Sequence, residues 1–210
     1  MADRPIIIAS STPRADIGRL AKELGALSAA WADSIHIDVM DGRFVPLDDA
    51  PGNFAIVREA LLALSPILAD NTHAAPTQGL NPQAATSVYQ RDQLAFYWAD
   101  HLDPNRPLFE VNLPGLGPLR HTASLFLDTE VLADRDNWVA AVVESKAGSR
   151  INLIYPALES SQLGAFLVAG NAGAPILGRL LQRDPNRLAA RLHPIVYLCI
   201  FHDAEARSAA

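Results

Sequence analysis

Short apolar runs alternate along this chain with segments whose apolar residues recur at helical spacing. Residues 6–9 are continuously apolar, as in a parallel strand covered on both faces, and residues 17–30 carry apolar side chains three and four positions apart. In residues 34–40 the aliphatic side chains at 35, 37 and 39 alternate with His, Asp and Met at 36, 38 and 40, which predicts a second strand. Strand, helix and strand in this order predict a βαβ unit with parallel pairing.

Short apolar runs and segments of helical spacing continue to alternate up to the C-terminus. Asn53 precedes a second amphipathic segment that runs to Leu64, and residues 74–81 contain the Pro and Gly residues of a loop. The other predicted elements are strands at 66–70, 109–112, 124–127, 151–155, 166–169 and 195–201, a long helix at 83–101, and a helix that begins at Asp136 and includes residues 138–143.

The number of strand candidates, with helices between most of them, predicts a (β/α)8 TIM barrel. Residues 157–163 leave space for only one or two helical turns, so we expect the barrel to be incomplete or distorted. A length of 210 residues fits one domain, and we interpret 1–210 as a single (β/α)-barrel domain.

Composition and charge narrow the class of protein. Hydrophobic residues make up 50% of the chain and charged residues 19%, which are values of an ordinary globular protein. A net charge of -6 argues against nucleic acid and anionic membranes as partners. No apolar stretch approaches a membrane span, and Cys199 has no second cysteine to pair with, so we expect a cytoplasmic protein.

The predicted strand at 34–40 contains the candidate catalytic and metal-binding residues. Side chains alternate along a strand, so His36, Asp38 and Met40 share one face while Ile35, Ile37 and Val39 share the other. Polar residues on an inward face near the carboxyl end of a barrel strand are typical of a catalytic site. An imidazole and a carboxylate two residues apart can bind one cation.

Residues 6–46, and above all His-Ile-Asp-Val-Met-Asp-Gly at 36–42 followed by Phe-Val-Pro at 44–46, resemble the opening of the ribulose-phosphate 3-epimerase family. A weaker similarity covers 165–190, where an apolar strand leads into Gly170 and Asn171 like the last strand and phosphate loop of that family. Residues 111–117 also resemble the family's Asn-Pro-Gly loop, although they come early in the chain.

The resemblance implies a metal-dependent epimerase of the pentose phosphate pathway, which interconverts ribulose 5-phosphate and xylulose 5-phosphate through an enediolate. It implies a barrel of the ribulose-phosphate-binding type, a divalent metal (Zn, Fe, Mn or Co) and a sugar-phosphate substrate. The implied site consists of His36, Asp38 and His73 as metal ligands, Asp38 as acid/base, and Ser11, Met40, Gly170 and Asn171 as substrate-binding residues.

The chain also departs from the family pattern. No Asp-Gly-Gly segment supplies a second catalytic carboxylate, and His73 follows Asp70 by three residues instead of two, although Asp128 or Asp203 could act instead. Two alternatives therefore stay open: a related sugar-phosphate isomerase or lyase, and a non-catalytic descendant that binds a phosphosugar or a partner protein. A homo-oligomer is among the assemblies that the sequence allows. We interpret the histidines at 101, 121, 193 and 202 as solvated or satisfied residues.

Overall fold

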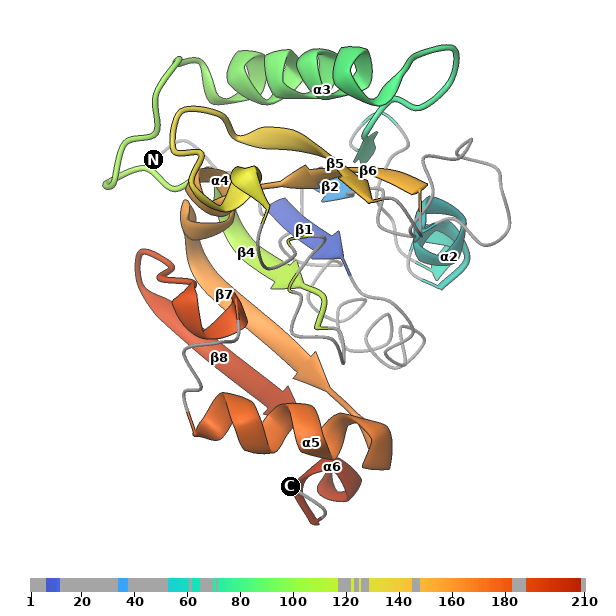
Figure 1. Ribbon diagram of the computed structural model, residues 1–210, viewed down its shortest axis with the longest axis vertical. Coiled ribbons are helices and arrows are strands. Elements are labelled where there is room, and N and C mark those ends of the chain that lie inside the picture. The colour runs from blue at the N-terminus through green and yellow to red at the C-terminus, as the bar shows by residue number, and fades with distance from the viewer. Residues whose placement is uncertain are drawn as a thin grey trace.

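The computed structural model contains a six-stranded parallel sheet with the strand order β3-β2-β1-β4-β7-β8 (Figure 1). The structure describes residues 7–11, 34–37, 53–60, 62–64, 70, 72–116, 122, 125, 129–144, 148–182 and 188–208. The sheet consists of β1 (Ile7–Ser11), β2 (Ser34–Ile37), β3 (Thr72–Ala74), β4 (Phe109–Pro114), β7 (Ser161–Val168) and β8 (Tyr197–His202). A separate antiparallel hairpin consists of β5 (Val139–Glu144) and β6 (Gly148–Leu153).

The helices lie around these strands. In Figure 1, α3 runs along the hairpin at one end of the molecule, and α5 and α6 lie beside β7 and β8 at the other end. The described helices are α2 (Asn53–Ala60), η1 (Leu62–Leu64), α3 (Pro82–Tyr97), η3 (Glu130–Leu132), α4 (Tyr155–Glu159), α5 (Gly170–Leu181), η4 (Leu188–Arg191) and α6 (Ala204–Ser208). None of these described helices is long and apolar enough to cross a membrane.

The sheet is open, so the prediction of a TIM barrel is wrong. A closed barrel requires every strand to have two neighbours, whereas among the described strands β3 and β8 each pair on one side only. The hairpin accounts for one of the predicted barrel strands, the one expected at 151–155, because β6 pairs with β5 and not with the parallel sheet. Counting apolar runs could not show this difference.

Most predicted strands are confirmed where the structure describes them, but one helix prediction is wrong, and the strand predicted at 66–70 lies almost entirely outside the described residues. Residues 139–144 form β5 and not the helix expected after Asp136, because their apolar residues pair with those of β6, as Val139 does with Leu153. The third strand begins at Thr72, after the predicted 66–70. The helix expected at 17–30 lies outside the described residues, as does most of the strand expected at 124–127.

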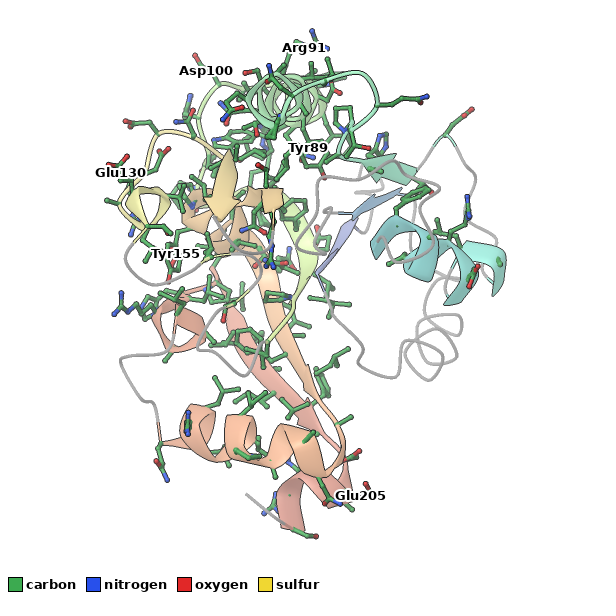
Figure 2. All side chains as sticks on the ribbon, turned by 45° about the vertical axis from the view of Figure 1, so that its right-hand side comes forward. Tyr89, Arg91, Asp100, Glu130, Tyr155 and Glu205 are labelled. Carbon is green, nitrogen blue, oxygen red and sulfur yellow. The ribbon has the colours of Figure 1, made fainter. Side chains whose placement is uncertain are left out.

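Helix α3 is bound to the hairpin through its buried face. Tyr89 and Tyr97 are buried on that face, and the Tyr97 ring meets the Trp138 ring edge to face at a centroid distance of 5.4 Å. Figure 2 shows Tyr89 on the side of α3 that faces the strands and Arg91 on the outer side. The hydrophobic core continues from here through the sheet, with Phe109 and Phe166 fully buried.

Gln90 links the same helix to the entry of β5 through hydrogen bonds. Its Oε1 accepts from the backbone N–H groups of Trp138 at 3.0 Å and Val139 at 3.2 Å, and its Nε2 donates to Asn137 Oδ1 at 3.1 Å. One side-chain amide thus satisfies two backbone donors at the start of a strand. The hairpin is held against α3 by this contact as well as by apolar packing.

Glu159, at the end of α4, lies in a half-buried position near η4. Burial raises the pKa of the Glu159 carboxyl, while the backbone N–H of His193, which donates to Glu159 Oε1 at 3.1 Å, and the charges of His193 and Arg135 oppose that shift. The folded protein therefore binds this proton more tightly than the unfolded chain does. The contribution of Glu159 to stability is greatest at low pH and is lost as the pH rises through the pKa of the folded state.

We expect Gln90→Ala to lower the free energy of unfolding by about 1–3 kcal/mol, because two backbone N–H groups lose their acceptor. Urea denaturation measures the change. Gln83→Ala, at an exposed position near the start of the same helix, is the control and should stay near wild type. Equal stabilities of the two variants would show that the Gln90 contacts contribute nothing.

We expect Glu159→Gln to raise the melting temperature Tm relative to wild type by an amount that grows between about pH 4 and pH 7. The amide keeps an acceptor for the His193 N–H and carries no charge to bury. Thermal unfolding across this pH range measures the difference between the two Tm values. A difference that does not change with pH would contradict the account.

Candidate active site

The strand order reverses at β1, and this reversal creates the candidate site. From β1 the chain continues to β2 and β3 on one side of the sheet and later returns to β4 on the other side. In open parallel sheets the connections from two such strands diverge, and a ligand-binding crevice forms beyond their carboxyl ends. β1 ends at Ser11 and β4 at Pro114, and these two residues are register partners.

The chain that follows β4 folds back at this crevice. Leu116 forms an isolated antiparallel bridge with Thr122, and Thr122 forms another with Leu125. Thr122 is 1% exposed, and its hydroxyl has no hydrogen-bond partner in the described part of the chain. A buried hydroxyl without a partner costs about 1–3 kcal/mol, so a polar ligand group that reached it would gain a hydrogen bond.

The predicted site residues of the first strands are only partly described. Ser11 lies at the strand reversal, and His36 is the register partner of both Ala9 in β1 and His73 in β3. The two histidine positions are therefore adjacent on neighbouring strands. Asp38 and Met40 lie outside the described residues.

The predicted metal ligands are not tested as a set, because Asp38 is not described. Among the described residues, no group of three or more His, Cys, Asp or Glu side chains could hold a metal ion. The divalent metal and the ligand roles of His36, Asp38 and His73 therefore stay predictions.

A cavity of about 490 Å³ lies between α2, β3 and α3. Phe54, His73, Tyr89, Asp92 and Phe96 contribute to its wall. β3 is two strands away from β1 in the sheet, which corresponds to roughly 10 Å at the usual strand spacing. We place the candidate active site at the strand reversal, because that position follows from the topology of the whole sheet.

Gly170 and Asn171, the predicted phosphate-binding residues, begin α5 directly after β7. Gly170 has a φ of 69°, and its backbone N–H donates to Asp203 Oδ2 at 2.9 Å. The other oxygen of that carboxylate, Oδ1, accepts from the N–H of Ala206 at 2.8 Å, and the side chain of Asn171 is exposed. The Gly170 amide thus already binds an anionic group of the protein itself, and Asp203 holds the ends of β7 and β8 together.

Sequence reasoning missed the segment around Thr122. Residues 111–117 resemble the Asn-Pro-Gly loop of the epimerase family, but they come too early in the chain to be the phosphate loop of a barrel. In the observed sheet β4 is a central strand next to β1, so Gly115 and Leu116, which follow it, lie at the strand reversal. The signal was present as Pro114 and Gly115 at a strand end, followed by His121 and Thr122.

Comparisons with known proteins relate this chain to one family. A family profile described as "Glucosamine-6-phosphate isomerases/6-phosphogluconolactonase" matches residues 11–199. The chain is 33% identical over 180 residues to the 6-phosphogluconolactonase of Nostoc, an alignment that covers 85% of this chain and 71% of the relative. It is 30% identical over 199 residues to the 6-phosphogluconolactonase of Bos taurus, covering 90% and 75%.

A solved structure has a fold similar to that of this chain. The crystal structure of a 6-phosphogluconolactonase from Thermotoga maritima matches with a TM-score of 0.72 at 23% identity, covering 95% of this chain and 86% of that chain. This likeness shows the fold, an α/β fold with a parallel sheet and no closed barrel.

These findings overturn the resemblance to ribulose-phosphate 3-epimerase. That resemblance relied on residues 6–46, whereas the family match spans 11–199 and includes the middle of the chain that the epimerase pattern left unmatched. The prediction of a metal-dependent epimerase is therefore wrong, and so is the expected isomerase class. Carbohydrate metabolism and the pentose phosphate pathway fit both families.

We expect Asp203→Ala to lower the free energy of unfolding by about 1–3 kcal/mol, because the Gly170 and Ala206 amides lose a charged acceptor. Urea denaturation measures this loss, and amide hydrogen exchange should show faster exchange at those two positions. Glu205→Ala, at an exposed position in α6, serves as the control. Unchanged exchange at Gly170 in Asp203→Ala would contradict the assigned role.

Proposed function

This chain belongs to the glucosamine-6-phosphate isomerase/6-phosphogluconolactonase family, and on that premise we propose that it hydrolyses 6-phosphogluconolactone to 6-phosphogluconate. The observation that carries the proposal is the sequence similarity to the Nostoc and bovine proteins, both of which are named 6-phosphogluconolactonase. That name describes hydrolysis of a lactone, the cyclic ester of a phosphorylated sugar acid. The substrate is then a phosphorylated sugar lactone, in keeping with the pentose phosphate pathway.

The reaction sets clear requirements for a site. A water molecule adds to the lactone carbonyl carbon, the carbonyl oxygen becomes an oxyanion, and the bond from that carbon to the ring oxygen then breaks. A general base must take a proton from the attacking water, and the ring oxygen must receive a proton as it leaves. Hydrogen-bond donors must face the oxyanion in a site shielded from bulk water.

We assign the role of general base to His121. Histidine is the side chain whose ordinary pKa is closest to neutral pH, and His121 adjoins Thr122 in the sequence. Thr122 in turn bridges to Leu116 just beyond β4, at the strand reversal. The Thr122 hydroxyl, buried and without a partner among the described residues, is the donor we assign to a substrate oxygen.

The phosphate of the substrate is an anion and therefore calls for cationic side chains, although the chain as a whole carries a net charge of -6. Two arginines follow the strands that flank the crevice. Arg14 comes three residues after the end of β1 at Ser11, and Arg120 directly precedes His121. We assign phosphate binding to these two guanidinium groups, which suit the geometry of a phosphate.

We expect the purified protein to release protons from 6-phosphogluconolactone at pH 7 faster than the spontaneous hydrolysis, as measured in a pH-stat. His121→Gln should lower kcat/KM by about 10²–10⁴, the usual contribution of general-base catalysis. His101→Gln, which changes an exposed histidine after the end of α3, is the control and should keep full activity.

Separate outcomes of this assay test separate claims. Folded wild-type protein without turnover would overturn the proposed function, whereas full activity of His121→Gln would overturn only the role of that residue. Glucosamine 6-phosphate, offered as the alternative substrate within the family, should not be converted. Repeating the assay with a chelator tests the predicted divalent metal.

A further inference from the structure

The cavity of about 490 Å³ between α2, β3 and α3 lies apart from the strand reversal and takes no part in the reaction proposed above. Phe54 of α2, the residues of β3 and one side of α3 line it. Its volume falls within the range of about 300–1,000 Å³ that is usual for small-molecule sites in proteins. The side chains of its wall therefore indicate which class of molecule it can bind.

Helix α3 presents both polar and aromatic side chains to this cavity. Four of its residues line the cavity at positions three and four apart, hence on one side of the helix: Tyr89, Asp92, Gln93 and Phe96. Tyr89 and Gln93 are buried, and Figure 2 shows Tyr89 on the side of α3 that faces the strands. The side chain of Asp92 is 58% exposed. The carboxylate of Asp92 therefore lies at the mouth of the cavity and the phenol of Tyr89 lies deeper.

Three aromatic rings line the cavity, those of Phe54, Tyr89 and Phe96. An aromatic ring attracts a cation that lies over its face within about 6 Å of the centroid, and the attraction grows as the cation loses its water. Rings also favour methyl and methylene groups, which leave water readily, over a small hydrated ion. This part of the wall therefore suits a cation that has an apolar surface.

The charge of the described lining favours a cation as well. Asp92 carries its only fixed charge, since no Lys or Arg is among these residues, and His73 gains a charge only by protonation. Arg91 Nη2 lies 3.4 Å from Asp92 Oδ1, but the Arg91 side chain is 72% exposed and Figure 2 shows it on the outer side of α3. Exposed ion pairs of this kind are weak, so Asp92 can still attract a cation at the mouth.

We propose that this cavity binds a small free organic cation of the alkylated ammonium class, with its charged head between the aromatic rings and the Asp92 carboxylate. Phosphorylated sugars are anions, which Asp92 repels, so the cavity is not a second site for the substrate proposed above. The phosphate of a lipid headgroup is repelled for the same reason. The proposal stands independently of the reaction that the protein catalyses.

Isothermal titration calorimetry with choline and with its uncharged isostere 3,3-dimethylbutan-1-ol tests whether the site selects a cation. At pH 8 histidine is uncharged, and choline is expected to bind at one site per chain, at least about tenfold more tightly than the alcohol. Equal affinities, or no saturable binding of choline, would overturn the proposal. Displacement of choline by 6-phosphogluconate, or binding of the protein to phosphatidylcholine vesicles, would overturn the assignment to a free cation.

Two variants test the wall, and circular dichroism checks that each one folds. Asp92→Asn keeps the size of the side chain and removes its charge, so it should weaken choline about two- to fivefold and leave the alcohol unchanged. Phe96→Leu removes a ring, so it should lower the ratio of the choline affinity to the alcohol affinity. Asp100→Asn makes the same charge change at a carboxylate that is 94% exposed beyond the end of α3, and it should bind choline like wild type. Asp92→Asn protein that matches Asp100→Asn protein in choline affinity would contradict the proposed site.

Discussion

The double pairing of β1 is the constraint on which the rest of the structure depends. Ile8 is the register partner of Ile35 on one side and of Val111 on the other, and both pairings are parallel. Parallel pairing requires long crossovers, and a strand with such neighbours on both sides makes the chain reverse its direction across the sheet. The reversal opens the crevice beyond Ser11 and Pro114. The candidate active site follows from the position of this one short strand.

The connections that leave the sheet are held by side chains that bind backbone groups. Gln90 accepts from the first N–H groups of the hairpin, and Asp203 accepts from the amides that begin α5 and lie within α6. Asn112, buried within β4, donates from its Nδ2 to the carbonyl of Leu158 at 3.0 Å and so binds the turn that leads into β7. A scaffold fixed in this way can present reactive groups on the loops at its carboxyl edge, which is where open parallel sheets carry their function.

The sequence predicted several of the strands, but neither the hairpin strand β5 nor the order of the strands in the sheet. Apolar runs predicted strands at 6–9, 109–112 and 195–201 because the periodicity of side chains is local, and the structure places β1, β4 and β8 there. Whether a row of parallel strands closes into a barrel depends on pairing between distant residues, which no local pattern records. The resemblance of 6–46 to an epimerase misled for a related reason, since a strand, a helix and a second strand open many parallel folds. His121 was interpreted as a solvated or satisfied residue because its spacing from the other histidines pairs it into no metal site, and the neighbouring positions of β4 and β1 are not visible in a local pattern.

The most direct test of a site at the strand reversal is an NMR titration of ¹⁵N-labelled protein with 6-phosphogluconate, the stable product of the proposed reaction. The account predicts saturable amide shifts at Ser11, Gly115, Leu116 and Thr122, at the carboxyl ends of β1 and β4. The amides of Gln90 and Glu159, which lie on α3 and α4, should not move. Shifts centred on the cavity around His73 and Phe96, or no saturable shift at all, would contradict the account.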